Sequence, residues 1–216
     1  MTMQHQVGLN LVPVTIQQLL ILERPIGQIF INNKGVYKSI FEPMAIIRPV
    51  EIEQYYKRGI TQFYATEEDF SQIKNLMFQR LQDATRKLSV GDALESGTHY
   101  LFTLLQNLSL LYEDYHNQKL LSLIFQTSPS FTIYLQSNKK IITDLYRAVT
   151  QDRSHYLFKQ PVLSSLFLTA FITQYNIFST REVQDLFLIS LLKDLGMCFL
   201  PREAWDASKL DSYQQE

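Results

Sequence analysis

The chain has few of the residues on which several classes of protein depend. It holds one cysteine, Cys198, among 216 residues, which excludes an internal disulfide framework and fits a reducing compartment. Its seven glycines form no glycine-rich phosphate loop. The formal net charge of −1 provides no overall attraction to nucleic acid or to an anionic membrane.

Long apolar runs are missing as well. The nearly apolar runs around residues 163–172 and 186–192 contain Ser or Thr and are shorter than the roughly 20 residues of a membrane-spanning helix. The N-terminus, Met1-Thr-Met-Gln-His-Gln, lacks the basic and then apolar pattern of a signal peptide. We therefore expect a cytoplasmic protein without membrane insertion and without a nucleic-acid partner. With 46% hydrophobic residues, the chain can bury a core.

Residues 1–88 are predicted to form a small α+β domain. Strands are favoured between Leu9 and Phe41, and residues 28–31 and 36–41 flank the turn sequence Asn32-Asn-Lys-Gly35, which is typical of a hairpin. Residues 49–58, with proline in the first turn and Gly59 at the end, indicate a short helix. The alternating residues 60–64 predict another strand.

A long helix is expected to complete this domain. Thr66 can cap it, and the acidic residues 67–69 suit the positive end of the helix dipole. Its apolar residues recur at steps of three or four, namely Phe70, Ile73, Met77, Leu81, Ala84 and Leu88. This stripe is interpreted as packing on its own domain, and the alternative is a signalling or dimerisation helix. The polar residues 89–97, with two glycines, are predicted to be a linker.

Residues 98–216 are predicted to be an all-α domain, because helical patterns follow one another without a strand signal. Helices are expected at residues 99–115 and 139–149, and an apolar segment at 120–125 is expected to end before Ser128-Pro129. Pro161 is placed in the first turn of the next helix. Ser179 and Glu182 form a capping box for a last helix that reaches Asp194 and stops at Gly196.

Residues 191–201, Leu-Leu-Lys-Asp-Leu-Gly-Met-Cys-Phe-Leu-Pro, resemble the signature of the HD-GYP branch of the HD phosphohydrolases, roughly Leu-Leu-His-Asp-Ile-Gly-Lys-Ile-Gly-Ile-Pro. Residues 12–15, 30–37, 57–64 and 67–70 resemble the small α+β domain that precedes the catalytic domain in some HD-GYP proteins. The resemblance covers residues 9–88 and 155–210. It implies a partial HD-like helical domain, since the chain would hold about its first half, and an exposed core face would then require a partner.

The resemblance also assigns motif positions. HD enzymes bind metal through an early histidine and the His-Asp pair, and this metal activates water and neutralises phosphate. The early histidine corresponds to Gln160, or to Pro161 if the register slips by one, and the histidine of the pair is Lys193. Asp194 is retained. The lysine expected to contact substrate phosphate is Met197, and it follows the retained Gly196. We interpret Gln160, Lys193, Asp194, Gly196 and Met197 as vestigial positions, and expect no catalytic residue, metal or cofactor.

The other candidate ligands do not restore such a site. His99 and His116 are expected at opposite ends of one helix, and His155 is interpreted as a surface or capping residue. Cys198 is interpreted as a small buried side chain without a base to activate it.

Three hypotheses for function follow. The first is a non-catalytic signalling or regulatory protein that associates with itself or with another signalling protein, with cyclic-di-GMP as a ligand that the retained residues do not support. The second is a metal-dependent cyclic-di-GMP phosphodiesterase, with an altered ligand set such as Asp152, Asp185 and Asp194 or with ligands beyond this chain. The third is a helical adaptor unrelated to HD proteins.

Overall fold

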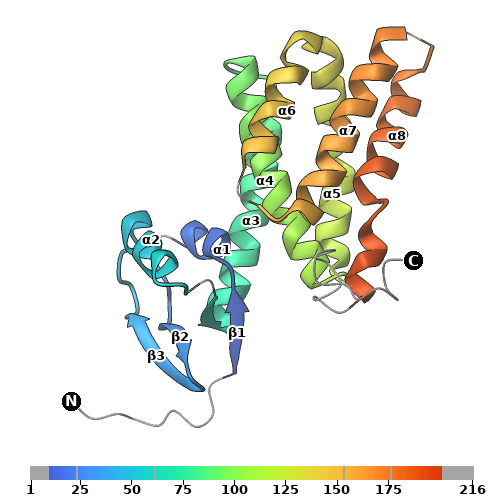
Figure 1. Cartoon of the computed structure of the whole chain (residues 1–216). Coiled ribbons are helices and arrows are strands. Elements are labelled where there is room, and N and C mark those ends of the chain that lie inside the picture. The colour runs from blue at the N-terminus through green and yellow to red at the C-terminus, as the bar shows by residue number, and fades with distance from the viewer. Residues whose placement is uncertain (1–9, 23, 61, 153, 176, 201–216) are drawn as a thin grey trace. The chain divides into compact units, whose positions relative to one another are not determined.

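The computed structural model describes residues 10–22, 24–60, 62–152, 154–175 and 177–200. It divides into two compact units, Met1–Met77 and Phe78–Glu216, each of which is described by itself. The first contains a small sheet with short helices, and the second contains helices in all of its described elements (Figure 1). The predicted fold class, an α+β part followed by a helical HD-like part, is confirmed.

The sheet of the first unit has four strands in the order β1-β4-β2-β3. These are β1 (Leu11–Val14), β2 (Ile29–Asn33), β3 (Val36–Phe41) and β4 (Phe63–Thr66), and all pairings are antiparallel. The predicted hairpin is confirmed as β2 and β3. Lys34 and Gly35 both have positive φ, 52° and 86°, as a two-residue turn between twisted strands requires.

Of two helices in this unit, one was predicted from the sequence and the other was not. Helix α2 (Pro49–Lys57) is confirmed, and its Tyr55 ring contacts the rings of Phe41 and Phe63 on the sheet. Helix α1 (Ile16–Ile21) lies where strands were expected. The prediction was wrong because Thr15 and Gln18 form a capping box, in which each side chain bonds the backbone of the other residue.

Asp69 anchors the beginning of helix α3 (Glu67–Lys87). Its fully buried carboxylate accepts hydrogen bonds from the backbone N–H groups of Ile26 and Gly27 and from the Thr66 hydroxyl. Thr66 in turn accepts from the Asp69 N–H, so the predicted cap is present. A Cβ atom on Gly27 would lie 2.7 Å from Asp69 Oδ2, so this close approach requires glycine.

The apolar stripe of α3 is buried at Ile73, Met77, Leu81 and Ala84. The division between the two compact units falls within this helix, after Met77. The predicted linker at residues 89–97 lies further along the chain, and its residues from Ala93 onward form the first turn of the next helix, where Asp92 is the N-cap. That domain boundary stays a prediction.

The second unit packs its helices side by side (Figure 1). They are α4 (Ala93–Glu113), α5 (Gln118–Ser137), α6 (Ile142–Gln151), α7 (Tyr156–Tyr175) and α8 (Thr180–Leu192), with the short 3-10 helices η1 (Lys139–Ile141) and η2 (Leu195–Phe199). Helix α4 packs against α5, α6, α7 and η2, and helix α7 packs against α4, α5, α6 and α8.

Two prolines lie further inside helices than their sequence context suggested. Helix α5 continues through Ser128-Pro129, and α7 begins at Tyr156, five residues before Pro161. A proline removes one hydrogen bond from a helix. Here the flanking residues Phe131, Leu135, Val162 and Leu166 are fully buried, and this packing outweighs the loss.

Several hydroxyl groups lie within the helical core. Those of Thr103, Thr127, Thr169 and Thr173 each donate to the carbonyl group four residues earlier, which satisfies a buried donor without a second partner. Among the described residues, no helix is both long enough and apolar enough to cross a membrane.

Candidate functional site

Helices α7 and α8 bring the first set of predicted site residues together. The two helices run side by side in Figure 1, and Ser165 Oγ of α7 donates to the Phe187 carbonyl of α8 at 3.2 Å. The predicted capping box at Ser179 and Glu182 is confirmed and begins α8. Because the helices are antiparallel neighbours, Gln160 near the start of α7 lies beside Lys193, which follows the end of α8.

The Lys193 ammonium group connects the motif positions. Its Nζ atom donates to Gln160 Oε1 at 2.9 Å and to Asp194 Oδ2 at 2.5 Å. Gln160 Nε2 donates to Ser164 Oγ at 3.2 Å, which orients the amide so that its oxygen faces the lysine. The Lys193 and Asp194 side chains are 37% and 32% exposed, so this cluster, named here the Lys193 site, lies at the edge of the helical core.

The backbone after α8 differs from the prediction. The helix ends at Leu192 and not at Gly196, which lies inside η2 at a position where a Cβ would meet nothing within 4 Å. The Met197 N–H donates to the Asp194 carbonyl and begins this tighter turn. Gly196 therefore does not terminate the helix, and Pro201 lies outside the described residues.

Cys198 and Tyr112 complete the surroundings of Asp194. Cys198 is half-buried where full burial was expected, because η2 packs at the end of the bundle, and its thiol donates to the Leu195 carbonyl. Burial raises the pKa of this thiol. Burial also raises the pKa of the Tyr112 phenol on α4, and the negative charges of Asp194 and Cys198 raise it further. The helix predicted at residues 99–115 includes Tyr112, but the sequence assigned this residue no role at the site. The phenol oxygen of Tyr112 is the feature of the sequence that could have indicated a polar role.

The Lys193 site does not fit a divalent metal ion. Its polar groups are one carboxylate, one neutral amide oxygen and a lysine ammonium that bonds both oxygens. A metal ion needs several oxygen or imidazole donors, and it would be repelled by an ammonium among them. In the described parts of the chain, no three His, Cys, Asp or Glu side chains gather as metal ligands.

The alternative ligands considered from the sequence lie apart. Asp185 and Asp194 are nine positions apart along α8 and its end, about 13 Å at the rise of a helix. Asp152 ends α6, where its Oδ1 accepts from the Ser154 N–H. His155 is exposed and its Nδ1 accepts from the Leu157 N–H, so its interpretation as a surface or capping residue is confirmed. His116 lies beyond the end of α4, against the Tyr115 ring.

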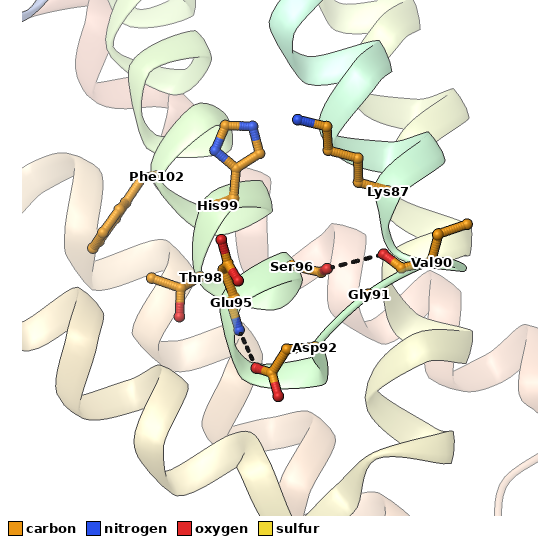
Figure 2. Close-up of a pocket in the computed structure, with 9 residues that line it drawn as sticks. All are labelled: Lys87, Val90, Gly91, Asp92, Glu95, Ser96, Thr98, His99 and Phe102. Atoms are coloured by element: carbon orange, nitrogen blue, oxygen red, sulfur yellow. Dashed lines mark hydrogen bonds between the residues drawn. The ribbon is translucent and has the colours of Figure 1, made fainter.

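A pocket of about 550 Å³ lies where the chain passes from α3 to α4 (Figure 2). The His99 ring and the Lys87 side chain both face it. Burial lowers the pKa of His99, the positive charges of Lys87 and Arg80 lower it further, and Glu95 opposes them. The lining residues are Lys87, Val90, Gly91, Asp92, Glu95, Ser96, Thr98, His99 and Phe102. None of them belongs to the Lys193 site.

Comparison with known proteins identifies the fold. No family model and no curated protein matches the chain. Among solved structures, it is similar to Bd1817, a HDG"Y"P protein from Bdellovibrio bacteriovorus, with a TM-score of 0.59 and 12% sequence identity over 95% of this chain and 67% of that one. The fold is HD-GYP-like. At this identity the likeness concerns the HD-GYP-like fold alone.

Proposed function

We propose that this chain is a non-catalytic signalling or regulatory protein, built on the HD-GYP-like fold, that acts by binding a partner or a second copy of itself. The observation that carries the proposal is the position of Lys193 Nζ, which hydrogen-bonds both Gln160 Oε1 and Asp194 Oδ2. The HD-GYP resemblance assigns metal-binding histidines to the positions of Gln160 and Lys193, and a metal-binding aspartate to Asp194.

The chemistry of the lysine supports this proposal. An ammonium group is a compact cation with three N–H donors and no lone pair to offer a metal. It neutralises the charge of Asp194 from within the chain, in the place where a catalytic ion would have to contact the same oxygens. A metal ion would need to displace Lys193 from both partners and then tolerate a positive charge close by. The site thus favours its own lysine over an exogenous cation.

Loss of the metal site would remove the activated water on which phosphodiester hydrolysis depends in this class of enzyme. Asp194 and the helices around it would then have a structural role, in which they support the surface that binds the partner. A regulatory protein of this kind acts through association, and its partner recognises the surface and not a reaction centre.

The test uses the full chain, with an active HD-GYP phosphodiesterase as the positive control. We expect no stoichiometric Fe, Mn or Zn after equilibration with each metal, and no linear or mononucleotide product from cyclic-di-GMP. Lys193→Ala should also remain inactive, because removal of the cation restores neither missing imidazole. Metal-dependent hydrolysis by the wild-type chain, abolished by Asp194→Asn, would overturn the proposal in favour of an altered-ligand phosphodiesterase.

A further inference from the structure

Large apolar side chains are exposed on two neighbouring helices of the second unit. On α7, Phe167 is 67% exposed, and Phe171 and Tyr175 are also exposed. On α8, Ile189 is 66% exposed. Single exposed apolar residues are common, but several on adjacent helices mark an interaction surface. Phe167, Phe171, Tyr175 and Ile189 are together named the α7–α8 face.

The side chains of the α7–α8 face point toward solvent from the same side of the helix pair. Residues three or four positions apart share one side of a helix, so Phe167 and Phe171 continue a row that begins at Gln160 and Ser164. Ile189 likewise shares a row with Lys193. The hydrogen bond from Lys193 to Gln160 joins the ends of the two rows. The Phe171 and Tyr175 rings contact each other with centroids 4.9 Å apart, which makes this part of the face continuous.

The charges beside Ile189 indicate which partner fits. The exposed Asp185 lies four residues before Ile189, and Lys193 lies four residues after it. If two copies of α8 pack antiparallel around a twofold axis at Ile189, each acidic residue meets a basic one. Asp185 would face Lys193 of the partner subunit, and Ile189 would face Ile189 of the partner subunit. A parallel pairing would place like charges together.

Lys193 has the hydrogen-bonding capacity for such a contact. An ammonium group carries three N–H donors. Within the described part of the chain, two of them have acceptors, Gln160 Oε1 and Asp194 Oδ2. The third N–H can therefore bond a carboxylate from a second copy while the Lys193 site stays intact.

We propose that the chain forms a homodimer through the α7–α8 face, with two copies of α8 antiparallel around a twofold axis at Ile189. The inference deepens the proposed function by naming its partner as a second copy, and it rests on that function. Phe167 and Phe171 lie one and two turns beyond Ser164 on the neighbouring helix α7, and the partner would cover them. The apolar centre provides the association free energy, and the Asp185–Lys193 pairs select the antiparallel orientation.

Cross-linking of the full chain tests the axis directly. Cys198→Ser first removes the native thiol, and Ile189→Cys then places one thiol from each copy at the axis, within the reach of a disulfide. With a mild copper–phenanthroline oxidant, we expect a covalent dimer in high yield. The control is Val90→Cys in the same background, because Val90 is 73% exposed but lies in the α3–α4 connection. Equal yields from both variants, or no dimer from Ile189→Cys, would overturn the proposed interface.

Molecular mass in solution provides an independent readout. We expect twice the 25.3 kDa mass of the chain for the wild type and for Val90→Glu, and the single-chain mass for Ile189→Glu. Asp185→Lys should raise the dimer dissociation constant at least tenfold. Circular dichroism checks that each variant is folded. A monomeric wild type, or a dimeric Ile189→Glu, contradicts the interface. A monomer that still fails to hydrolyse cyclic-di-GMP overturns the dimer but leaves the non-catalytic proposal standing.

Discussion

Lys193 Nζ hydrogen-bonds Gln160 Oε1 at 2.9 Å across 33 positions of sequence. The same nitrogen donates to the adjacent Asp194 carboxylate. One cation thus connects the start of α7 to the end of α8 and bonds oxygens of both Gln160 and Asp194. This relationship underlies the proposed function and the first two predictions.

Replacing Lys193 with Met should lower stability slightly. The substitution leaves the Asp194 carboxylate without its partner, and partly exposed pairs of this kind contribute about 1 kcal/mol or less. The midpoint of thermal unfolding should therefore fall by about 2–4 °C or less for a chain of this size. Arg147→Met is the matched control, because its pair with Asp144 is 70% and 48% exposed. A Lys193→Met chain as stable as the wild type would mean that the contact contributes nothing.

Restoring two histidines should create a metal site. In the double variant Gln160→His and Lys193→His, two imidazoles and the Asp194 carboxylate form a ligand set suited to Zn²⁺. At a hundredfold excess over its dissociation constant, a ligand stabilises a protein by about 2.7 kcal/mol. Differential scanning fluorimetry with Zn²⁺ should therefore show a higher unfolding midpoint for the double variant, but not for the wild type or Gln160→His alone. An equal shift in the wild type would contradict the account of Lys193.

His99 should titrate below its ordinary pKa of 6.5. Burial is the larger cause and Lys87 the next, so Lys87→Met should raise the NMR titration midpoint only part of the way back. The folded chain binds fewer protons than the unfolded chain in this range. Stability should therefore fall as the pH drops through 6.5 towards the folded-state pKa, relative to His99→Gln. Lys140→Met should leave the midpoint unchanged, and a Lys87→Met midpoint equal to that of the wild type would refute the electrostatic cause.

Asp69→Ala should strongly destabilise the first unit. The substitution leaves the part-buried Ile26 and Gly27 N–H groups without their acceptor, and an unsatisfied group that is buried costs about 1–3 kcal/mol. Hydrogen exchange should show faster opening of the first unit, whereas Asp83→Ala, at an exposed pair with Arg86, should have little effect. Unchanged exchange in Asp69→Ala would show that this carboxylate does not anchor α3.

Elements with local capping or turn chemistry could be predicted from the sequence. Gly35 favours a turn, and the capping box of Ser179 and Glu182 favours the start of a helix. Both signals act locally and do not depend on tertiary packing. Helix α1 was missed because its six residues are too few for a helical period to stand out among the expected strands, and the Thr15–Gln18 capping box is its main signal. The interior prolines of α5 and α7 were misplaced, because tertiary burial decides whether a helix continues through a proline.

The candidate site was predictable only in part. The resemblance around residues 191–201 pointed to Gln160 and Lys193 as related positions, but composition and periodicity contain no information about a contact across 33 residues. That contact depends on how α7 packs against α8. Tyr112 was missed for the same reason, since the influence of Asp194 on its pKa arises from the packing of α4 against η2, which begins next to Asp194.

The most direct test of the central claim is a hydrolysis assay of the full chain with cyclic-di-GMP in the presence of Mn²⁺ or Fe²⁺, followed by separation of the nucleotides. Because Lys193 stands where the HD-GYP resemblance places a metal-binding histidine, and its ammonium group already bonds Asp194, we expect product no higher than in protein-free controls. Turnover that requires metal and is lost in Asp194→Asn would contradict the account.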